Sequence, residues 1–252
     1  MLDILIYDKE LKLMVSRIIR TIRKYKLITE NETIAVALSG GKDSTVLLYI
    51  LWYINSFSYL KFKLLGIHVQ TGDYDYSVLE KLCDLLGVEF VKLNIDMEKI
   101  INHPYVCYSC SRIKRHAMYQ EISKRGISKI AYGHHADDAI ETFLMNLLLH
   151  HNIESFPPKL MYEKLDLAVI RPLIFIREEW IQEVFEKKNL TKLAYKCPYE
   201  ERNVRHDFRG KVEKMQQLFP EYSVEDNIIK ALETQYDLLF AQEIDNSIKV
   251  FK

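Results

Sequence analysis

One stretch near the start of the chain joins the pattern of a β-strand directly to that of an α-helix. It covers residues 35–54 and reads AVALSGGKDSTVLLYILWYI. Alternating apolar residues come first, an apolar helical run comes last, and glycines, serines, a lysine and an aspartate lie between them. A strand that passes through a Gly-Gly turn into a helix presents unpaired backbone N–H groups and the positive end of the helix dipole, and these bind anions. The stretch therefore predicts an α/β fold with a phosphate site at this turn.

The alternation of strands and helices continues along the chain. Strands are predicted over residues 33–38, 62–69, 88–93 and 129–132, with helices over 44–54, 77–86, 112–124 and 137–149. An amphipathic helix precedes them over 8–27, and a short strand in 167–173, a helix over 178–188 and two helices within 203–243 follow. This order implies a doubly wound parallel sheet with helices on both faces. We expect an N-terminal helical segment (1–30), a nucleotide-binding α/β domain (31–190) and a C-terminal helical extension (191–252).

The composition is that of a globular chain with one main domain. Its 252 residues are 48% apolar, which suffices for a large core. The longest apolar run, Val46–Ile54, is far shorter than the roughly 20 residues that span a bilayer, so we expect no transmembrane segment. The first residues are acidic where a secretory signal is basic, which favours a cytoplasmic protein. In that compartment the four cysteines are not expected to form a disulfide framework, and a clustered pair is better interpreted as ligands or redox groups.

Basic residues are concentrated in two stretches, although the chain has no net charge. Lysine plus arginine and aspartate plus glutamate both total 35, so no overall field attracts nucleic acid. Residues 17–26 and 202–211 are nevertheless basic, and the tail after Pro220 is mainly acidic. Such stretches are expected of a protein that binds a phosphate backbone, and they also occur on ordinary solvated helix faces. Charge alone leaves both interpretations open.

The turn SGGKDS, Ser39–Ser44, does not match two common phosphate-binding motifs. Val36 and Asp43 stand where the Walker motif needs a glycine and a serine or threonine. Gly40 and Gly41 are adjacent, unlike the glycines of the dinucleotide fingerprint. The turn resembles the PP-loop of the ATP pyrophosphatase superfamily, whose members adenylate a substrate and release pyrophosphate.

This resemblance implies that the six residues of the turn bind ATP: Ser39, Gly40, Gly41, Lys42, Asp43 and Ser44. The glycines let the backbone approach the phosphates, the serine hydroxyls donate hydrogen bonds, and Lys42 offsets the charge that develops on pyrophosphate. Asp43 would repel phosphate unless a cation lay between them, so we interpret it as a Mg²⁺ ligand. The alternative is a tight turn whose polar residues are incidental.

A second polar cluster, YGHHADDAIET at residues 132–142, follows another predicted strand. Two histidines and two aspartates emerge there at the carboxyl end of the strand, where open α/β sheets place their sites: His134, His135, Asp137 and Asp138. Both clusters are therefore expected to face one cleft. The aspartates are assigned to magnesium binding or to positioning the acceptor, and His134 to the ATP site. The predicted catalytic residues are Lys42, Asp43, Asp137 and Asp138. The alternative for Asp137 is to cap the helix that it begins.

The cysteines predict a metal or redox centre. Cys107 and Cys110 form a Cys-x-x-Cys pair, whose spacing lets two thiolates bind one metal or each other. Cys83 lies on the apolar side of a predicted helix and is interpreted as a core residue. Cys197 precedes Pro198, as a ligand on a loop would. Three ligands suit a four-iron cluster in which one iron lacks a protein thiolate and can bind sulfide. A persulfide and disulfide relay without metal is the alternative.

Five motifs in this order resemble the tRNA 2-thiocytidine synthetases, the TtcA family: SGGKDS, CYSCSRIKR, GHHADDAIET, FPPKLM and IRPLIFIREEWIQ. The resemblance extends from about residue 30 to residue 215. It implies an ATP-dependent enzyme with a 4Fe–4S cluster on Cys107, Cys110 and Cys197, which replaces the C2 oxygen of a cytidine in the tRNA anticodon loop (C32) with sulfur. Some relatives carry a second cysteine where this chain has Glu200, and this chain is shorter than many members.

The resemblance also implies a two-step reaction. ATP at the glycine turn places its α-phosphate in line with the cytosine oxygen, and sulfur then attacks C2 and expels AMP. An anticodon loop presents the base without the melting of a duplex. Arg112, Lys114 and Arg115 are expected either to guide the RNA or to form a solvated helix face. The other partners considered are a sulfur donor such as a cysteine desulfurase and, in a homodimer, a second copy of the chain.

Two other functions use the same nucleotide turn. An adenylating ligase of the lysidine synthase or amidotransferase type would use nitrogen as the nucleophile and would not need three ligand cysteines. A non-enzymatic nucleotide sensor would not release pyrophosphate when tRNA is added. The sequence leaves these alternatives open.

Overall fold

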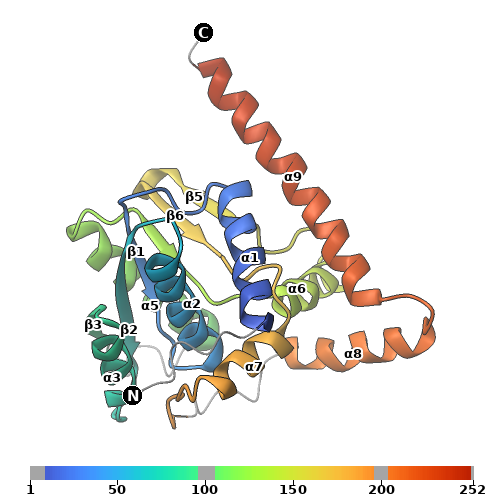
Figure 1. Cartoon of the computed structure of the whole chain (residues 1–252). Coiled ribbons are helices and arrows are strands. Elements are labelled where there is room, and N and C mark those ends of the chain that lie inside the picture. Colours follow the sequence, from blue (N-terminus) through green and yellow to red (C-terminus); the bar gives the residue numbers. More distant parts are fainter. Residues whose placement is uncertain (1–8, 96–105, 196–203, 251–252) are drawn as a thin grey trace.

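The chain folds around one six-stranded sheet (Figure 1). The computed structural model describes residues 9–95, 106–195 and 204–250. The strands are β1 (Thr33–Ala37), β2 (Lys63–Gln70), β3 (Glu89–Asn94), β4 (Lys129–Ala131), β5 (Lys159–Tyr162) and β6 (Leu167–Ile170). Their order is β3-β2-β1-β4-β6-β5, and each neighbouring pair is parallel except β5 and β6. The predicted α/β fold is confirmed, with one antiparallel strand at an edge.

The edge strand β5 is the strand that the sequence pattern did not predict. A single turn of 3-10 helix, η1 (Glu163–Leu165), and Asp166 with a φ of 45° connect it to β6. A connection this short joins antiparallel neighbours, because a parallel pair needs a crossover of a dozen or more residues. The hairpin extends the sheet on the side away from β3.

Among the described residues, six helices belong to the α/β body: α1 (Lys9–Lys24), α2 (Lys42–Phe57), α3 (Ser77–Leu86), α5 (Val106–Lys124), α6 (Ala136–Leu149) and α7 (Glu178–Lys187). The two predicted terminal helices are α8 (Val204–Leu218) and α9 (Val224–Val250), which lie on the side of the sheet away from β3 (Figure 1). α8 packs on α6, and α9 packs on both of them. The start of α5 differs most from the prediction, at Val106 rather than at residue 112.

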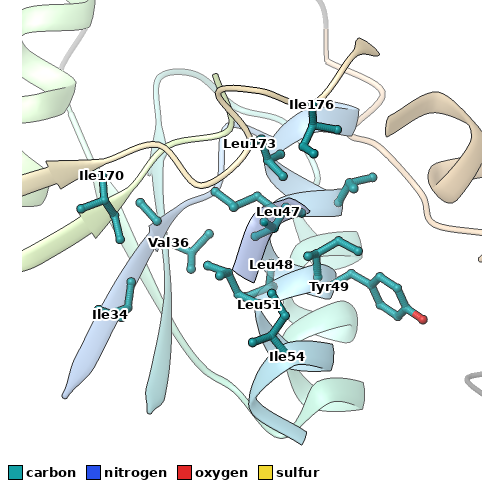
Figure 2. Packing of buried hydrophobic residues seen from close by; sticks show 14 of the residues in the cluster. Ile34, Val36, Leu47, Leu48, Tyr49, Leu51, Ile54, Ile170, Leu173 and Ile176 are labelled. Atoms are coloured by element: carbon teal, nitrogen blue, oxygen red, sulfur yellow. The ribbon is translucent and has the colours of Figure 1, made fainter. Parts of the chain in front are cut away.

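Strand β1 lies in the middle of the sheet and sends its side chains into two cores. Ile34 and Val36 contact the larger core, which α1, α2, α3 and α7 form, whereas Ala35 faces the core beneath α5. Figure 2 shows the leucines and isoleucines of α2 directed at β1 and at the segment after β6. Each such side chain, when fully buried, contributes about 1.5–3 kcal/mol. This packing fixes the start of α2 at the carboxyl edge of the sheet.

The N-terminal helix α1 packs on the same side of the sheet. Four apolar residues on the side of α1 that faces the core are buried: Leu11, Met14, Ile18 and Ile22. Leu13, on another side of the helix, is 50% exposed. None of the helices in the described part of the chain combines the length and the apolar character that crossing a bilayer requires.

Candidate functional site

The turn after β1 is shaped by its glycines. Gly40 has a φ of 87°, and a Cβ on it would lie 2.1 Å from Cδ1 of Leu193. Gly41 is extended and precedes α2, whose first N–H groups have no partners within the helix. The hydroxyl of Ser44 donates a 3.0 Å hydrogen bond to the carbonyl of Gly41 and lies 3.1 Å from the hydroxyl of Ser39. The turn is therefore held by its own side chains in a form that suits an anion.

The turn after β4 lies directly against the turn after β1. The two strands are parallel neighbours, with Val36 opposite Ala131. A Cβ on Gly133 would lie 2.9 Å from the carbonyl carbon of Asp43 and 3.0 Å from the nitrogen of Ser44. Only a glycine permits this approach, so the two polar clusters predicted from the sequence meet at one edge of the sheet.

His135 lies among three carboxylates. Its side chain is 3% exposed; Nδ1 is 3.5 Å from Oδ2 of Asp137, and Nε2 is 3.5 Å from Oδ2 of Asp138 and 3.9 Å from Oδ1 of Asp43. Burial alone would lower the pKa of His135, but the three carboxylates outweigh it and raise this pKa above the usual value. The surrounding carboxylates thus favour the charged form of His135 beside the glycine turn.

Asp137 is held by α7 rather than by its own helix. Its Oδ2 accepts a 2.7 Å hydrogen bond from the backbone nitrogen of Glu178, and its Oδ1 lies 3.1 Å from Nε and 3.0 Å from Nη2 of Arg177. Burial favours a raised pKa for Asp137, but His135, this amide and Arg177 together hold the pKa well below its usual range. Asp137 is therefore an ionised carboxylate in a fixed orientation.

Asp138 has the capping role that the sequence suggested as the alternative for Asp137. Its Oδ2 accepts a 3.0 Å hydrogen bond from the backbone nitrogen of His135, the residue before α6. The alternative role of Asp137 as the cap does not hold, because the helix begins at Ala136 and its N-cap residue is His135.

Lys42 connects the glycine turn to α7. Its Nζ lies 2.9 Å from Oδ1 of Asp43 and 2.5 Å from Oε1 of Glu178. Burial would lower the pKa of Lys42, but the two carboxylates raise it, so the ammonium stays charged. The other oxygen of Glu178, Oε2, lies 2.9 Å from Nη2 of Arg209 on α8. Glu178 thus orients Lys42 and is itself oriented by a C-terminal helix.

A cavity of about 370 Å³ opens beside Asp137, where α6, α7, α8 and α9 meet. Arg209 lies 3.0 Å from Oε1 of the buried Glu141, and Arg177 lies 2.5 Å from Oε2 of Glu225. Two arginines of the cavity wall therefore connect the terminal helices to the carboxylates of the site.

These wall residues were absent from the predicted site: Glu141, Arg177, Glu178, Arg209 and Glu225. Arg177 and Glu178 lie in the quoted motif IRPLIFIREEWIQ, and Arg209 lies in the basic stretch 202–211. These two features of the sequence could have pointed to the three residues. Their partners are remote in the sequence, as the 136 positions between Lys42 and Glu178 show. Short motifs therefore did not reveal the pairs.

His134 differs from its neighbour His135 in its surroundings. Its ring stacks on Phe156 at 4.7 Å and lies 5.8 Å from the ring of Tyr132. It is next to Gly133, and so close to the turn Ser39–Ser44. Its role in ATP binding stays a prediction.

The Cys-x-x-Cys pair lies in the first turn of α5. Cys107 and Cys110 are three residues apart on a helix, so their side chains share one side of it. Cys107 is exposed and Cys110 half-buried. Cys197, the third predicted ligand, lies outside the described residues. Cys83 is a core residue as predicted, and burial raises the pKa of its thiol to about 12.

Both segments that lead to the predicted cysteines approach the carboxyl edge of the sheet. Arg125, just after α5, lies 2.6 Å from Glu89 at the start of β3, so the opposite end of α5 points toward the edge with the glycine turn. On the other side, the nitrogen of Leu193 donates a 2.8 Å hydrogen bond to the carbonyl of Gly40. Tyr195 then stacks on Tyr74 at 4.1 Å.

The predicted RNA-guiding residues Arg112, Lys114 and Arg115 follow the cysteines on α5. Arg112 is exposed, and the other two are half-buried. Nε of Arg115 donates a 3.2 Å hydrogen bond to the carbonyl of Ser111. Burial lowers the pKa of His68, near the end of β2, and the charge of Lys114 lowers it further, which places Lys114 near that strand. Their contact with RNA stays a prediction.

The carboxylates suit a magnesium ion only in combination with another ligand. Within the described ranges, no three histidine, cysteine, aspartate or glutamate side chains form a metal-binding group. Mg²⁺ is commonly held by one or two carboxylates together with substrate phosphates. Asp43, at the glycine turn, is placed for this arrangement, and its role as a ligand stays a prediction.

The chain is similar in sequence to curated tRNA-modifying proteins. The tRNA-cytidine(32) 2-sulfurtransferases of Ralstonia pickettii (strain 12J) and Shigella dysenteriae serotype 1 (strain Sd197) are 36% and 37% identical to the chain over 172 and 175 residues. The alignments cover 65% and 66% of this chain and 54% and 56% of those proteins. The chain thus spans about half the length of the curated relatives it matches.

Among solved structures, the U34-tRNA thiolase NcsA from Methanococcus maripaludis with its 4Fe–4S cluster superposes with a TM-score of 0.68 at 20% identity. The superposition covers 90% of this chain and 80% of that one, which shows a common fold. The pattern of the PP-loop domain matches residues 12–215, most of the chain. The protein therefore belongs to the PP-loop domain family.

Proposed function

We propose that this protein is an ATP-dependent tRNA-cytidine 2-sulfurtransferase that acts on position 32 of the anticodon loop. The names of the relatives support the substrate. The observation that carries the proposal is the contact between the Gly40 turn and the turn that bears Asp137. Adenylation needs the phosphates and the acceptor within reach of each other, and this edge of the sheet brings a phosphate-type turn and fixed polar groups together.

ATP would lie with its phosphates over the Gly40 turn. The residues fit this group, because the positive φ and the missing Cβ expose backbone N–H groups at the start of α2. The cytosine O2 would attack the α-phosphate, and the bond to pyrophosphate would break. Lys42, with Mg²⁺ on Asp43, would stabilise the departing pyrophosphate. Asp137, held by Arg177, would orient the acceptor side of the site.

Cys107 and Cys110 fit two positions of an iron–sulfur cluster, since thiolates one helical turn apart can bind one metal group. Cys197 would be the third ligand. A cluster with one iron that lacks a protein thiolate supplies a binding place for sulfide. In the second step a C2–S bond forms, the C2–O bond breaks, and AMP leaves from the Gly40 turn. A cysteine desulfurase or similar donor would supply the sulfur as a persulfide, and a thiol reductant would provide the two electrons that release it as sulfide. The tRNA substrate implies a cytoplasmic protein.

The test combines nucleoside analysis with cysteine variants. A strain without the gene is expected to lose 2-thiocytidine from its tRNA, as measured by mass spectrometry. Wild-type protein and the matched control Cys83→Ala, a core cysteine, are expected to restore it, and Cys197→Ala is not. Anaerobically purified Cys197→Ala should bind ATP normally and contain less iron than the control. Unchanged 2-thiocytidine in the deletion strain would refute the activity, and loss of a lysidine or amidated nucleoside would identify the ligase alternative.

A further inference from the structure

Helix α1 carries a basic groove outside the candidate site. The groove has a volume of about 690 Å³, and four cations, two aliphatic residues, a serine and a tyrosine line it: Lys12, Arg20, Arg23, Lys24, Val15, Ile19, Ser16 and Tyr53. No acidic side chain is among its lining residues in the described part of the chain. Because the whole chain has equal numbers of basic and acidic residues, this local excess of positive charge is not a consequence of composition. The groove therefore matches a polyanion.

Aromatic rings hold the arginines of α1 in place. The guanidinium of Arg23 lies 4.5 Å from the ring centre of Tyr59, and that of Arg17 lies 4.5 Å from the ring centre of Trp180. Stacking restricts a guanidinium while its edge keeps N–H donors that suit phosphate oxygens. Lys24 differs, because Glu233 and Asp237 of α9 neutralise it at 2.8 and 2.7 Å.

The row of arginines starts beside the candidate site. Trp180, which contacts Arg17, lies in the first turn of α7, two residues after Glu178, the partner of Lys42. Arg23 contacts Tyr59, which follows the far end of α2. From Arg17 to Arg23 the helix rises roughly 9 Å. The cations therefore lead away from the glycine turn along the flank of the protein.

We propose that this α1 groove binds the phosphate backbone of the tRNA substrate, an inference that rests on the proposed function. A row of cations suits an extended chain of phosphates, whose binding releases counterions. A basic amphipathic helix can also bind a membrane surface through its apolar face. In α1 that face is buried in the core and cannot enter a bilayer: Leu11, Met14, Ile18 and Ile22.

The experiment compares the double variant Arg20→Ala and Arg23→Ala with wild-type protein. Binding of unmodified tRNA is measured by fluorescence anisotropy between about 50 and about 200 mM KCl. We expect the variant to bind about tenfold more weakly, with a salt-dependence slope smaller by about 1 to 2, because two phosphate contacts are lost. Its ATP affinity should be unchanged. The matched control, Lys81→Ala with Lys164→Ala, removes two exposed cations from other surfaces and should bind tRNA like the wild type.

Equal affinity and slope for the double variant and the wild type overturn the groove assignment. Retained tRNA binding with loss of binding to phosphatidylserine vesicles also overturns it, and identifies a membrane contact. If wild-type protein binds tRNA and the double variant does not, but no 2-thiocytidine forms, the groove is supported and the proposed activity is refuted. The two proposals therefore fail in different ways.

Discussion

Gly40 combines two constraints in one residue, a positive φ and a position without room for a Cβ. We predict that Gly40→Ala lowers the free energy of unfolding by about 3 kcal/mol or more, because the backbone strain adds to overlap with Leu193. The displaced turn should also lose ATP binding. Denaturant unfolding and calorimetric titration with ATP measure the two effects.

Gly126 provides the matched control for this substitution. Its φ is 67°, and a Cβ there would meet nothing within 4 Å. Gly126→Ala should therefore lower the free energy of unfolding by only about 1 kcal/mol and leave ATP binding intact. Equal losses in the two alanine variants would show that contact with Leu193 is unimportant.

His68 gives the protein a dependence on pH. It is buried, with Nδ1 2.6 Å from the carbonyl oxygen of Leu38 and Nε2 3.2 Å from the hydroxyl of Tyr74. Burial lowers the pKa of His68, so the unfolded chain takes up a proton at a higher pH than the folded protein. Stability should fall as the pH drops below about 6.5 and level off below the folded pKa.

The variant His68→Gln removes this titration. The difference in free energy of unfolding between wild type and His68→Gln should be larger at about pH 7.5 than at about pH 5.5, as measured by denaturant unfolding. His135 is expected to act in the opposite direction above about pH 6.5, because its pKa is raised. A difference that does not change with pH contradicts the assignment to His68.

At the level of single residues, the sequence predicted which residues belong to the site better than it predicted which residues they contact. The serine and glycine turn and the two aspartates were recognised, because their order along the chain indicates their chemistry. The sequence did not show that Asp137 binds Arg177, since this contact depends on how α7 packs against α6. The bond of Asp138 to the backbone nitrogen of His135 is local, and it was missed because the start of α6 was placed one residue too late.

Among the elements, α7 positions the lysine of the glycine turn through one carboxylate. We predict that Glu178→Gln lowers the rate of tRNA-dependent pyrophosphate release about tenfold and changes the KM for ATP less than threefold. Without the charge of Glu178, Lys42 keeps Asp43 as its one anionic partner among the described residues, and it is less well oriented toward pyrophosphate. Steady-state assays over a range of ATP concentrations separate the two constants.

The neighbouring Glu179 is the control for Glu178. It is exposed and lines the same cavity, so Glu179→Gln makes the same chemical change without removing a contact to Lys42. Its rate should equal that of the wild type. A Glu178→Gln enzyme with normal turnover, or one whose only defect is a raised KM for ATP, would contradict the positioning role.

The helices and strands of the α/β body were predictable because their apolar periods are regular. β5 was missed, since a strand of four residues (KLMY) is too short to show an alternating pattern. α5 starts before its prediction because its first two turns hold polar residues and cysteines that carry no apolar period. Both differences occur where tertiary packing, rather than local pattern, decides the structure.

For the molecule as a whole, polar contacts of α9 with the end of α1 and with Tyr25 connect the terminal helices to the α/β body. Asp237 accepts a 2.8 Å hydrogen bond from the hydroxyl of Tyr25 and lies 2.7 Å from Nζ of Lys24. We predict that Asp237→Asn speeds amide hydrogen exchange in α9 several-fold, with little change in β1, because partly exposed pairs contribute less than about 1 kcal/mol. Asp226→Asn, an exposed aspartate on the same helix, should leave exchange unchanged. If both variants changed amide exchange equally in α9 and in β1, Asp237 would not hold α9 in place locally.

The pairing of β1 with β4 also makes the proposed nucleotide binding a sensitive indicator of correct folding. A slip of one residue between these strands would move Gly133 along the sheet by about 3.3 Å and exchange inward and outward side chains. The two turns would then no longer meet, even in a chain that kept its helices and most of its sheet. Spectroscopic measurements of secondary structure would hardly register such a misfolded form, whereas loss of nucleotide binding would reveal it at once.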